Sequence, residues 1–134
     1  MSMSDTTETA ALNMFLRGTD PAYRAGANQY LALFTGDPTE TASLAAEANY
    51  TGYSRVLLPK ASSWTGTASP FTNTNLIQFG PCTAGTNAIT HFAVVDTASA
   101  AVAMMISGAL SATLNVSNGI QPQFLAGALS ISAD

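Results

Sequence analysis

The chain has 134 residues and a formal net charge of −4, with 47% hydrophobic and 9% charged residues. This length suits one domain, and the single cysteine excludes an internal disulfide. Four basic residues are too few for the phosphate contacts that nucleic-acid binding needs, so no nucleic-acid partner is expected.

Scarcity of charge is the most informative feature of the composition. Soluble domains average about a quarter charged residues, whereas the cores of protein–protein interfaces are depleted in lysine and glutamate. The composition therefore favours a chain that buries surface against partner chains. The alternative is a hydroxyl-rich β protein that is monomeric.

No targeting or membrane segment is expected. Met1–Asp5 lacks a basic region followed by an apolar one, so it does not resemble a signal peptide. The most apolar stretch, Ala98–Leu110, is shorter than the roughly 20 residues of a membrane span. Cys82 is expected to be a small buried thiol.

The N-terminal region predicts a mobile arm over residues 1–8 and a short helix over Thr9–Arg17. Thr7 or Thr9 would cap this helix, and Gly18 would end it. Its apolar residues fall on one face at helical spacing. They are Ala11, Leu12, Phe15 and Leu16. A loop is expected over Thr19–Asn28.

Gln29–Thr35 is the clearest predicted strand, and it ends at the turn sequence Gly36-Asp37-Pro38. Both of its faces are apolar, which predicts a central strand. One face would meet the sandwich core, and the other would meet the N-terminal helix or a neighbouring subunit. Thr39–Ala48 is expected to contain one or two helical turns.

The rest of the chain predicts short strands separated by turns. They are Tyr53–Pro59, Leu76–Phe79, Ala88–Asp96, Val102–Gly108, Ala109–Val116, Gln121–Gly127 and Ala128–Ser132. Pro59 limits its strand to a sheet edge or a strand end. Ala61–Asn75 is either a long loop or a weak hairpin.

Turn signals every 8–12 residues are typical of an all-β sandwich or jelly roll. The predicted fold is therefore all-β: a jelly-roll-like antiparallel β-sandwich of about seven to eight strands with a short N-terminal helix. The arm over residues 1–8 would precede a single domain over residues 9–134.

Catalytic and metal chemistry find little support in the sequence. The lone histidine, His91, lacks the cysteine partners of a zinc site, and the carboxylates are scattered. His91 and Asp96 lie five apart on one predicted strand, so they point to opposite faces and disfavour a hydrolytic triad. No enzyme activity, metal or cofactor is expected. His91 is predicted to be partly buried and bonded to backbone or a carboxylate; the alternative is a pH-sensitive interface residue.

Glu47 and Arg55 flank Tyr53 in a chain with few charges. An ion pair between them would pin the loop onto the start of the following strand. The alternative is two solvated charges that contribute less than about 1 kcal/mol. The pinned loop is the favoured interpretation.

Four blocks in order resemble a family of small tailed-phage virion proteins, and the likeness covers roughly residues 10–134. The blocks are Tyr30-Leu-Ala-Leu-Phe-Thr-Gly-Asp-Pro38, Glu47 with Gly52-Tyr-Ser-Arg55, Ile89-Thr-His-Phe-Ala-Val-Val-Asp96, and Phe124-Leu-Ala-Gly-Ala-Leu-Ser-Ile131. Such proteins are catalogued as phage tail fibre proteins, and some relatives are capsid cement or decoration proteins. The matching positions are Tyr30, Leu33, Phe34, Asp37, Pro38, Glu47, Gly52, Tyr53, Arg55, Thr90, His91, Phe92, Asp96 and Gly127.

The resemblance implies a structural protein of the virion with a jelly-roll-like sandwich. The absence of a repeat or shaft favours a cement protein on the capsid exterior, bound to the major capsid protein and to itself as a homodimer or homotrimer. The alternatives are a tail fibre tip or adaptor, and a carbohydrate-binding sandwich using Trp64 near Asn73 and Asn75. Four aromatic residues are candidate interface anchors. They are Trp64, Phe71, Phe15 and Tyr23.

Overall fold

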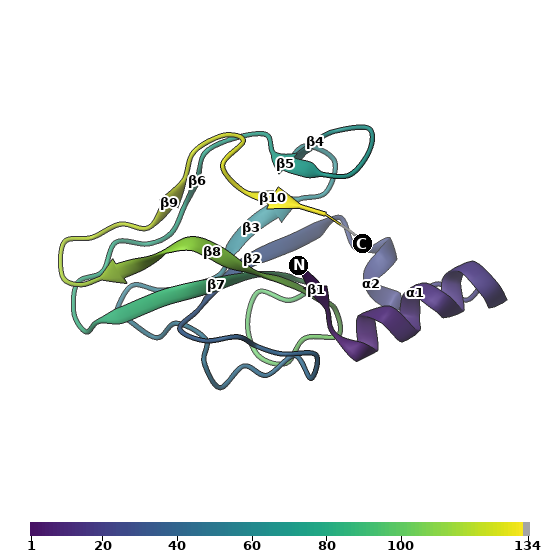
Figure 1. Cartoon of the computed structure of the whole chain (residues 1–134), viewed down its shortest axis with the longest axis horizontal. Helices are drawn as coiled ribbons and strands as arrows, with labels where there is room; N and C mark the ends of the chain where they lie inside the picture. Colours follow the sequence, from purple (N-terminus) through teal and green to yellow (C-terminus); the bar gives the residue numbers. More distant parts are fainter. Residues whose placement is uncertain (133–134) are drawn as a thin grey trace.

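The computed structural model describes residues 1–132, which form an all-β, sandwich-like fold with two helices (Figure 1). Its largest sheet has the strand order β1–β8–β7–β2–β3, and every pairing in it is antiparallel. The strands are β1 (Ser2–Met3), β2 (Asn28–Phe34), β3 (Val56–Pro59), β7 (Asn87–Val95) and β8 (Met105–Val116).

Short strands form a second layer, drawn above the five-stranded sheet in Figure 1. One group is β10 (Ser130–Ile131), β5 (Phe71–Asn73) and β4 (Trp64–Thr65), and the other is β6 (Ile77–Gln78) with β9 (Gln123–Phe124). The all-β sandwich prediction is confirmed, and residues 61–75 form the weak hairpin β4–β5. Within residues 1–132 there are ten strands in place of seven or eight, because β1, β4 and β5 are additional to those expected.

The main core lies between the two layers. It gathers side chains from both sheets and from the loops that join them. Its larger members are Leu31, Leu33, Tyr50, Leu58, Ile77, Phe79, Ile89, Phe92, Val94, Met104, Val116 and Leu129. Cys82 belongs to this core as the predicted buried thiol.

Strand β2 is central, as its two apolar faces predict: it lies between β7 and β3, and Leu31 to Phe34 are fully buried. One face enters the main core. The other face carries Ala32 and Phe34, which pack with Ala93, Val95 and Met105. The expectation that a helix or a neighbouring subunit covers this second face is wrong. Loop residues of the same chain cover it: Ala42, Leu44, Ala46 and Val102.

The N-terminal region differs from its prediction. Ser2 and Met3 pair with Ser107 and Ile106 of β8, and helix α1 (Asp5–Arg17) begins where an arm was expected. Ser4 caps the helix by accepting from the Thr7 N–H, in place of Thr7 or Thr9. A start at Asp5 also places acidic residues in the first turn, where they favour the helix dipole. The expected end at Gly18 is confirmed, since Gly18 has φ +65° and closes the last turn.

Three further segments differ in detail. Residues 39–48 form turns with no helix, and a short helix α2 (Ala22–Ala25) lies inside the predicted loop over residues 19–28. Strand β3 begins at Val56 and, as Pro59 predicts, is an edge strand. The two strands expected over residues 102–116 are one, β8, with a register shift against β7 between Ile89 and His91.

Candidate interaction site

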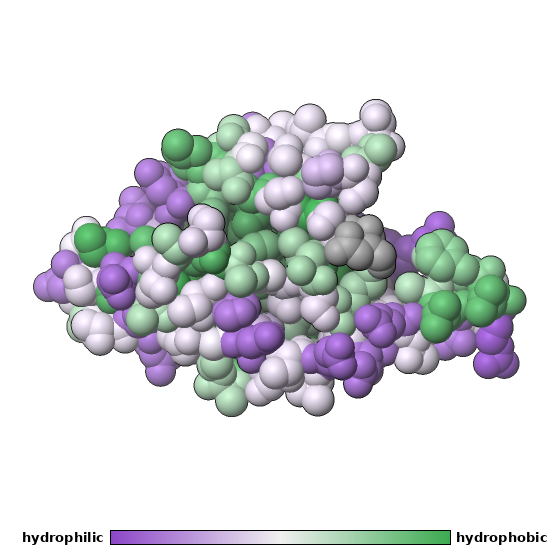
Figure 2. Space-filling model, in the orientation of Figure 1, coloured by the Kyte–Doolittle hydropathy of each residue, from purple (hydrophilic) through white to green (hydrophobic). Residues whose placement is uncertain are grey.

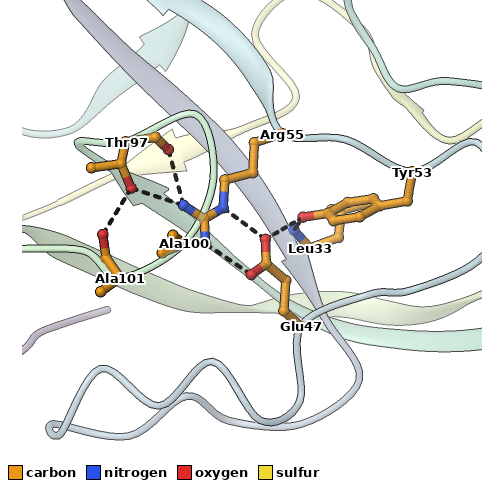
Figure 3. Close-up of polar contacts among 7 residues, drawn as sticks. All are labelled: Leu33, Glu47, Tyr53, Arg55, Thr97, Ala100 and Ala101. Carbon is orange, nitrogen blue, oxygen red and sulfur yellow. Dashed lines mark hydrogen bonds and ion pairs between the residues drawn. The ribbon is translucent and has the colours of Figure 1, made fainter.

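A cluster of polar contacts around Arg55, here called the Arg55 cluster, ties three loops to β2 (Figure 3). Arg55 Nε and Nη2 donate to the two Glu47 carboxylate oxygens at 2.7 and 2.8 Å. Nη1 donates to the carbonyl and hydroxyl of Thr97, each at 3.0 Å, and Nη2 also donates to the Ala100 carbonyl at 3.0 Å. All guanidinium N–H groups are thus used. The Arg55 side chain is 3% exposed and that of Glu47 17%, so the pinned-loop prediction is confirmed.

Tyr53 connects the Arg55 cluster to the core. Its hydroxyl donates to Glu47 Oε1 at 2.9 Å and accepts from the Leu33 N–H at 3.1 Å. Its ring stacks on Phe79, with ring centroids 6.1 Å apart. Burial raises the pKa of the Tyr53 phenol well above its ordinary value of 10.0. The hydrogen bond to Glu47 raises the pKa of the Arg55 guanidinium.

The backbone brings these side chains together because the segment after β2 returns alongside it. The Thr35 N–H donates to the Ala46 carbonyl and the Ala48 N–H donates to the Leu33 carbonyl, each at 2.8 Å. Glu47 is thereby held opposite Phe34. The chain then turns at Gly52, where φ is +104° and an added Cβ would lie 2.2 Å from the Pro81 carbonyl oxygen.

The other family-like residues lie in strands and turns. Tyr30, Leu33 and Phe34 are on β2, and Thr90, His91 and Phe92 are on β7. Asp37 Oδ1 accepts from the Thr39 N–H at 2.8 Å, and Pro38 is buried. Asp96 Oδ1 accepts from the Ala103 and Met104 N–H groups. Gly127 has φ +77° and donates to the Asn73 carbonyl at 2.8 Å. Their contacts shape and fix the fold.

The structure does not bring His91 and Asp96 together as a catalytic pair. His91 is half-buried, as expected, but its Nδ1 shares a hydrogen bond with the Thr90 hydroxyl at 2.9 Å, in place of a backbone group or carboxylate. Within residues 1–132, no three histidine, cysteine or carboxylate side chains gather where they could hold a metal ion. Neither helix of this part of the chain is long and apolar enough to cross a bilayer.

The four candidate anchors divide into two pairs. Trp64 is half-buried against the core, with its indole N–H donating to Gln29 at 3.2 Å, and Tyr23 also packs on the core. Phe71 is 37% exposed and Phe15 is 76% exposed. Phe15 thus stands out as the anchor that is free to meet a partner.

The exposed side of α1 is the strongest candidate surface. Leu12 and Leu16 lie beside Phe15 and are 58% and 78% exposed. Figure 2 shows hydrophobic side chains at the far end of the projecting helix, bordered by hydrophilic ones. The sequence placed these residues on one face and marked Phe15 as a candidate interface anchor, but it gave no sign that Leu12 and Leu16 would be exposed beside it. The outward side of α1, defined by Leu12, Phe15 and Leu16, is called the α1 face below.

The carbohydrate-binding alternative gains no support from Asn73. This residue is buried, its Nδ2 donates to the carbonyls of Asn75 and Leu125, and its Oδ1 accepts from the Leu129 N–H. Its amide therefore joins β5 to the C-terminal segment. Sequence reasoning missed this role, because two of the three partners, Leu125 and Leu129, lie more than 50 residues away.

Comparison with known protein families shows which family the chain belongs to. The family described as "Podophage GP4 fiber I protein gp80" matches residues 2–132. A comparison with individually curated proteins gave no match. The match over nearly the whole chain identifies a structural protein of a phage virion, with which the β-sandwich agrees. The chain belongs to the podophage GP4 fiber I protein gp80 family.

Proposed function

We propose that this chain is a non-catalytic structural subunit that assembles at a fibre of the phage particle. The observation that carries the proposal is the family match over residues 2–132, since the family is named for a fibre protein of a podophage. The α1 face supports it, because monomeric proteins seldom expose apolar side chains side by side without a partner to cover them.

The design of the chain suits docking better than chemistry. The charged groups with the strongest geometry, Glu47 and Arg55, are used inside the fold to hold loops in place. The apolar groups on α1 point outward. A rigid domain with an exposed apolar surface such as the α1 face is suited to attachment to larger partner chains.

A capsid cement protein is the second candidate. The observation that favours it is the build of the chain: residues 2–131 form a β-sandwich with two helices, and no elongated shaft is present in the part that the structure describes. In that role the partner would be the major capsid protein, and the protein would lie on the capsid exterior. We prefer the fibre to the capsid as the location of this subunit, because the family is named for a fibre protein.

Labelling of intact particles tests the place in the virion. Antibodies raised against the recombinant chain, coupled to gold, are expected to mark the fibres or tail of the phage that encodes it. A particle preparation from a deletion strain serves as the control for non-specific labelling. Gold confined to the capsid faces would replace the fibre proposal with the cement candidate. Absence of the chain from purified particles would overturn both.

A further inference from the structure

We propose that a hollow on the inner side of α1 binds a segment of a partner chain in which an apolar side chain stands next to a carboxylate. This hollow is called the α1 hollow below. The inference rests on the proposed docking role of the chain, because that role makes a protein segment the expected occupant. It names the chemistry of the partner, which the family match leaves open.

The α1 hollow lies between the inner side of α1, the short helix α2 and the start of β2, and its volume is about 340 Å³. Figure 1 shows α2 beside α1. Four side chains at i, i+3, i+4 and i+7 form the helix wall, a spacing that places them on one side of α1. They are Thr7, Ala10, Ala11 and Met14. The volume lies within the range of about 300–1,000 Å³ that is usual for binding sites.

The walls of the α1 hollow are largely apolar and adaptable. Met14 of α1 and the buried Met104 both line it. Methionine is unbranched and polarizable, so it fits irregular shapes and is common at surfaces that accept varied partners. Ala10 and Ala11 have short side chains that leave the space open. The α1 hollow therefore accepts an apolar side chain without requiring one particular shape.

Lys60 supplies the positive charge that the α1 hollow offers to an occupant. Its Nζ donates to the carbonyls of Tyr23 and Arg24 at 2.6 and 3.3 Å. An ammonium group has three N–H donors, so one remains for an anionic oxygen. Neither of the two ion pairs found within residues 1–132 includes Lys60.

The other charges near the α1 hollow leave this ammonium uncompensated. Arg24 pairs with Asp20, and both side chains are more than half exposed. Asp96 does not line the hollow, and its Oδ1 accepts from two backbone N–H groups. A positive charge beside apolar walls is unusual in a chain with a formal net charge of −4. Charge complementarity therefore selects an anionic group, and the walls select an apolar neighbour for it.

A protein segment supplies both groups in the smallest space. An acidic residue next to a leucine or methionine on a partner chain would place its carboxylate at Lys60 in a charge-assisted hydrogen bond. The apolar neighbour would then fill the space beside Ala10 and Met14. A nucleic-acid strand presents a row of phosphates, of which one ammonium can meet only one.

Titration of the isotope-labelled full-length chain, followed by two-dimensional NMR amide spectra, tests the proposal. The probes are acetyl-Leu-Glu-Leu-amide and acetyl-Leu-Gln-Leu-amide, which have nearly the same shape and differ in charge. The glutamate peptide is expected to shift the amide signals of Ala10, Met14 and Lys60. It should bind about tenfold more tightly than the glutamine peptide, because only its carboxylate can pair with the ammonium.

Variants of the chain locate the site. Lys60→Gln is expected to remove the preference for the glutamate peptide, and Ala10→Leu, which fills the hollow, is expected to abolish the shifts caused by both peptides. Arg17→Gln is the matched control, because Arg17 is a cation at the end of the same helix that does not line the hollow. Leu125→Ser changes a side chain that is 64% exposed outside α1 and should bind like the parent. Dispersed amide signals show that each variant is folded.

Equal affinity for the two peptides would overturn the proposal, and so would a preference that persists in Lys60→Gln. Decanoate, a carboxylate on an acyl chain, tests the other source of this chemistry. Shifts at the α1 hollow with decanoate but with neither peptide would replace the protein segment with a lipid acid. These results come from the purified chain, so their failure is distinguishable from a failure of the fibre proposal, which gold labelling tests.

Discussion

At the scale of single residues, Glu47 is the acceptor that holds Tyr53 and Arg55 together. Its two carboxylate oxygens accept from Arg55 and from the Tyr53 hydroxyl, and all three donors are held by the same turn of chain. Breaking a buried ion pair by removing one partner is costly, since the charge that remains has lost its compensation. The Arg55 cluster should therefore govern stability far more than the exposed charges do.

Glu47→Gln is expected to lower the free energy of unfolding by about 3 kcal/mol, because it leaves the Arg55 guanidinium buried without a counter-charge. Urea unfolding followed by circular dichroism measures the change. Asp20→Asn is the control, since its pair with Arg24 has side chains 59% and 54% exposed and should contribute about 0.5 kcal/mol or less. Equal effects of the two substitutions would contradict a structural role for the cluster.

Stability is expected to fall at alkaline pH because of Tyr53. Its pKa is raised in the folded chain, so the folded state holds the phenolic proton more tightly than the unfolded state does. This contribution is fully present below the unfolded pKa of about 10 and is lost as pH rises above it. Urea unfolding across this range should show the decline, and Tyr53→Phe should make it shallower. An unchanged pH profile in Tyr53→Phe would count against the assignment.

At the scale of elements, strands with strong local signals were predictable and their partners were not. A short apolar run that ends at a turn located β2, and apolar alternation located β7. The proximity of Glu47 to Arg55 in the sequence pointed to their pairing. The second layer was harder to predict, since its strands have two or three residues and depend on contacts such as those of Asn73. Likewise, no local signal shows that Thr97 and Ala100 complete the Arg55 cluster from more than 40 residues away.

The start of α1 shows the same limit. A polar stretch without apolar periodicity looks like an arm, yet Ser4 caps the helix there. The Thr7 hydroxyl also accepts from the Met105 N–H of β8 at 2.9 Å. This tertiary contact extends the helix beyond its apolar residues. Of the α1 face, the sequence indicated the common side of the helix and Phe15 as an anchor, but not the exposure of Leu12 and Leu16.

The turn at Gly52 gives a prediction at this scale. Gly52→Ala is expected to destabilise the chain by about 2 kcal/mol or more, because the new Cβ would meet the Pro81 carbonyl oxygen at a positive φ. Gly119→Ala is a matched control: φ there is +91°, but no atom lies within 4 Å, so about 1 kcal/mol of backbone strain is expected. Thermal unfolding of the two variants distinguishes clash from strain, and a smaller effect at Gly52 than at Gly119 would contradict the close approach.

At the scale of the whole molecule, charge and apolar surface are segregated. The strongest ion pair is buried, the second face of the main sheet is covered by the chain's own loops, and the most exposed large apolar side chains project on α1. A virion subunit built this way would attach through the helix and keep its sandwich unchanged.

Incorporation into particles tests this account most directly. A phage lacking the gene would be complemented with the parent chain, with Leu12→Ser plus Phe15→Ser, or with Leu125→Ser, and the chain would be counted per purified particle by quantitative mass spectrometry. The account predicts normal incorporation of the parent and of Leu125→Ser, and loss of the α1 variant, since its docking side is removed. Incorporation of the α1 variant at the parental level would contradict the claim that this protein works through its exposed helix.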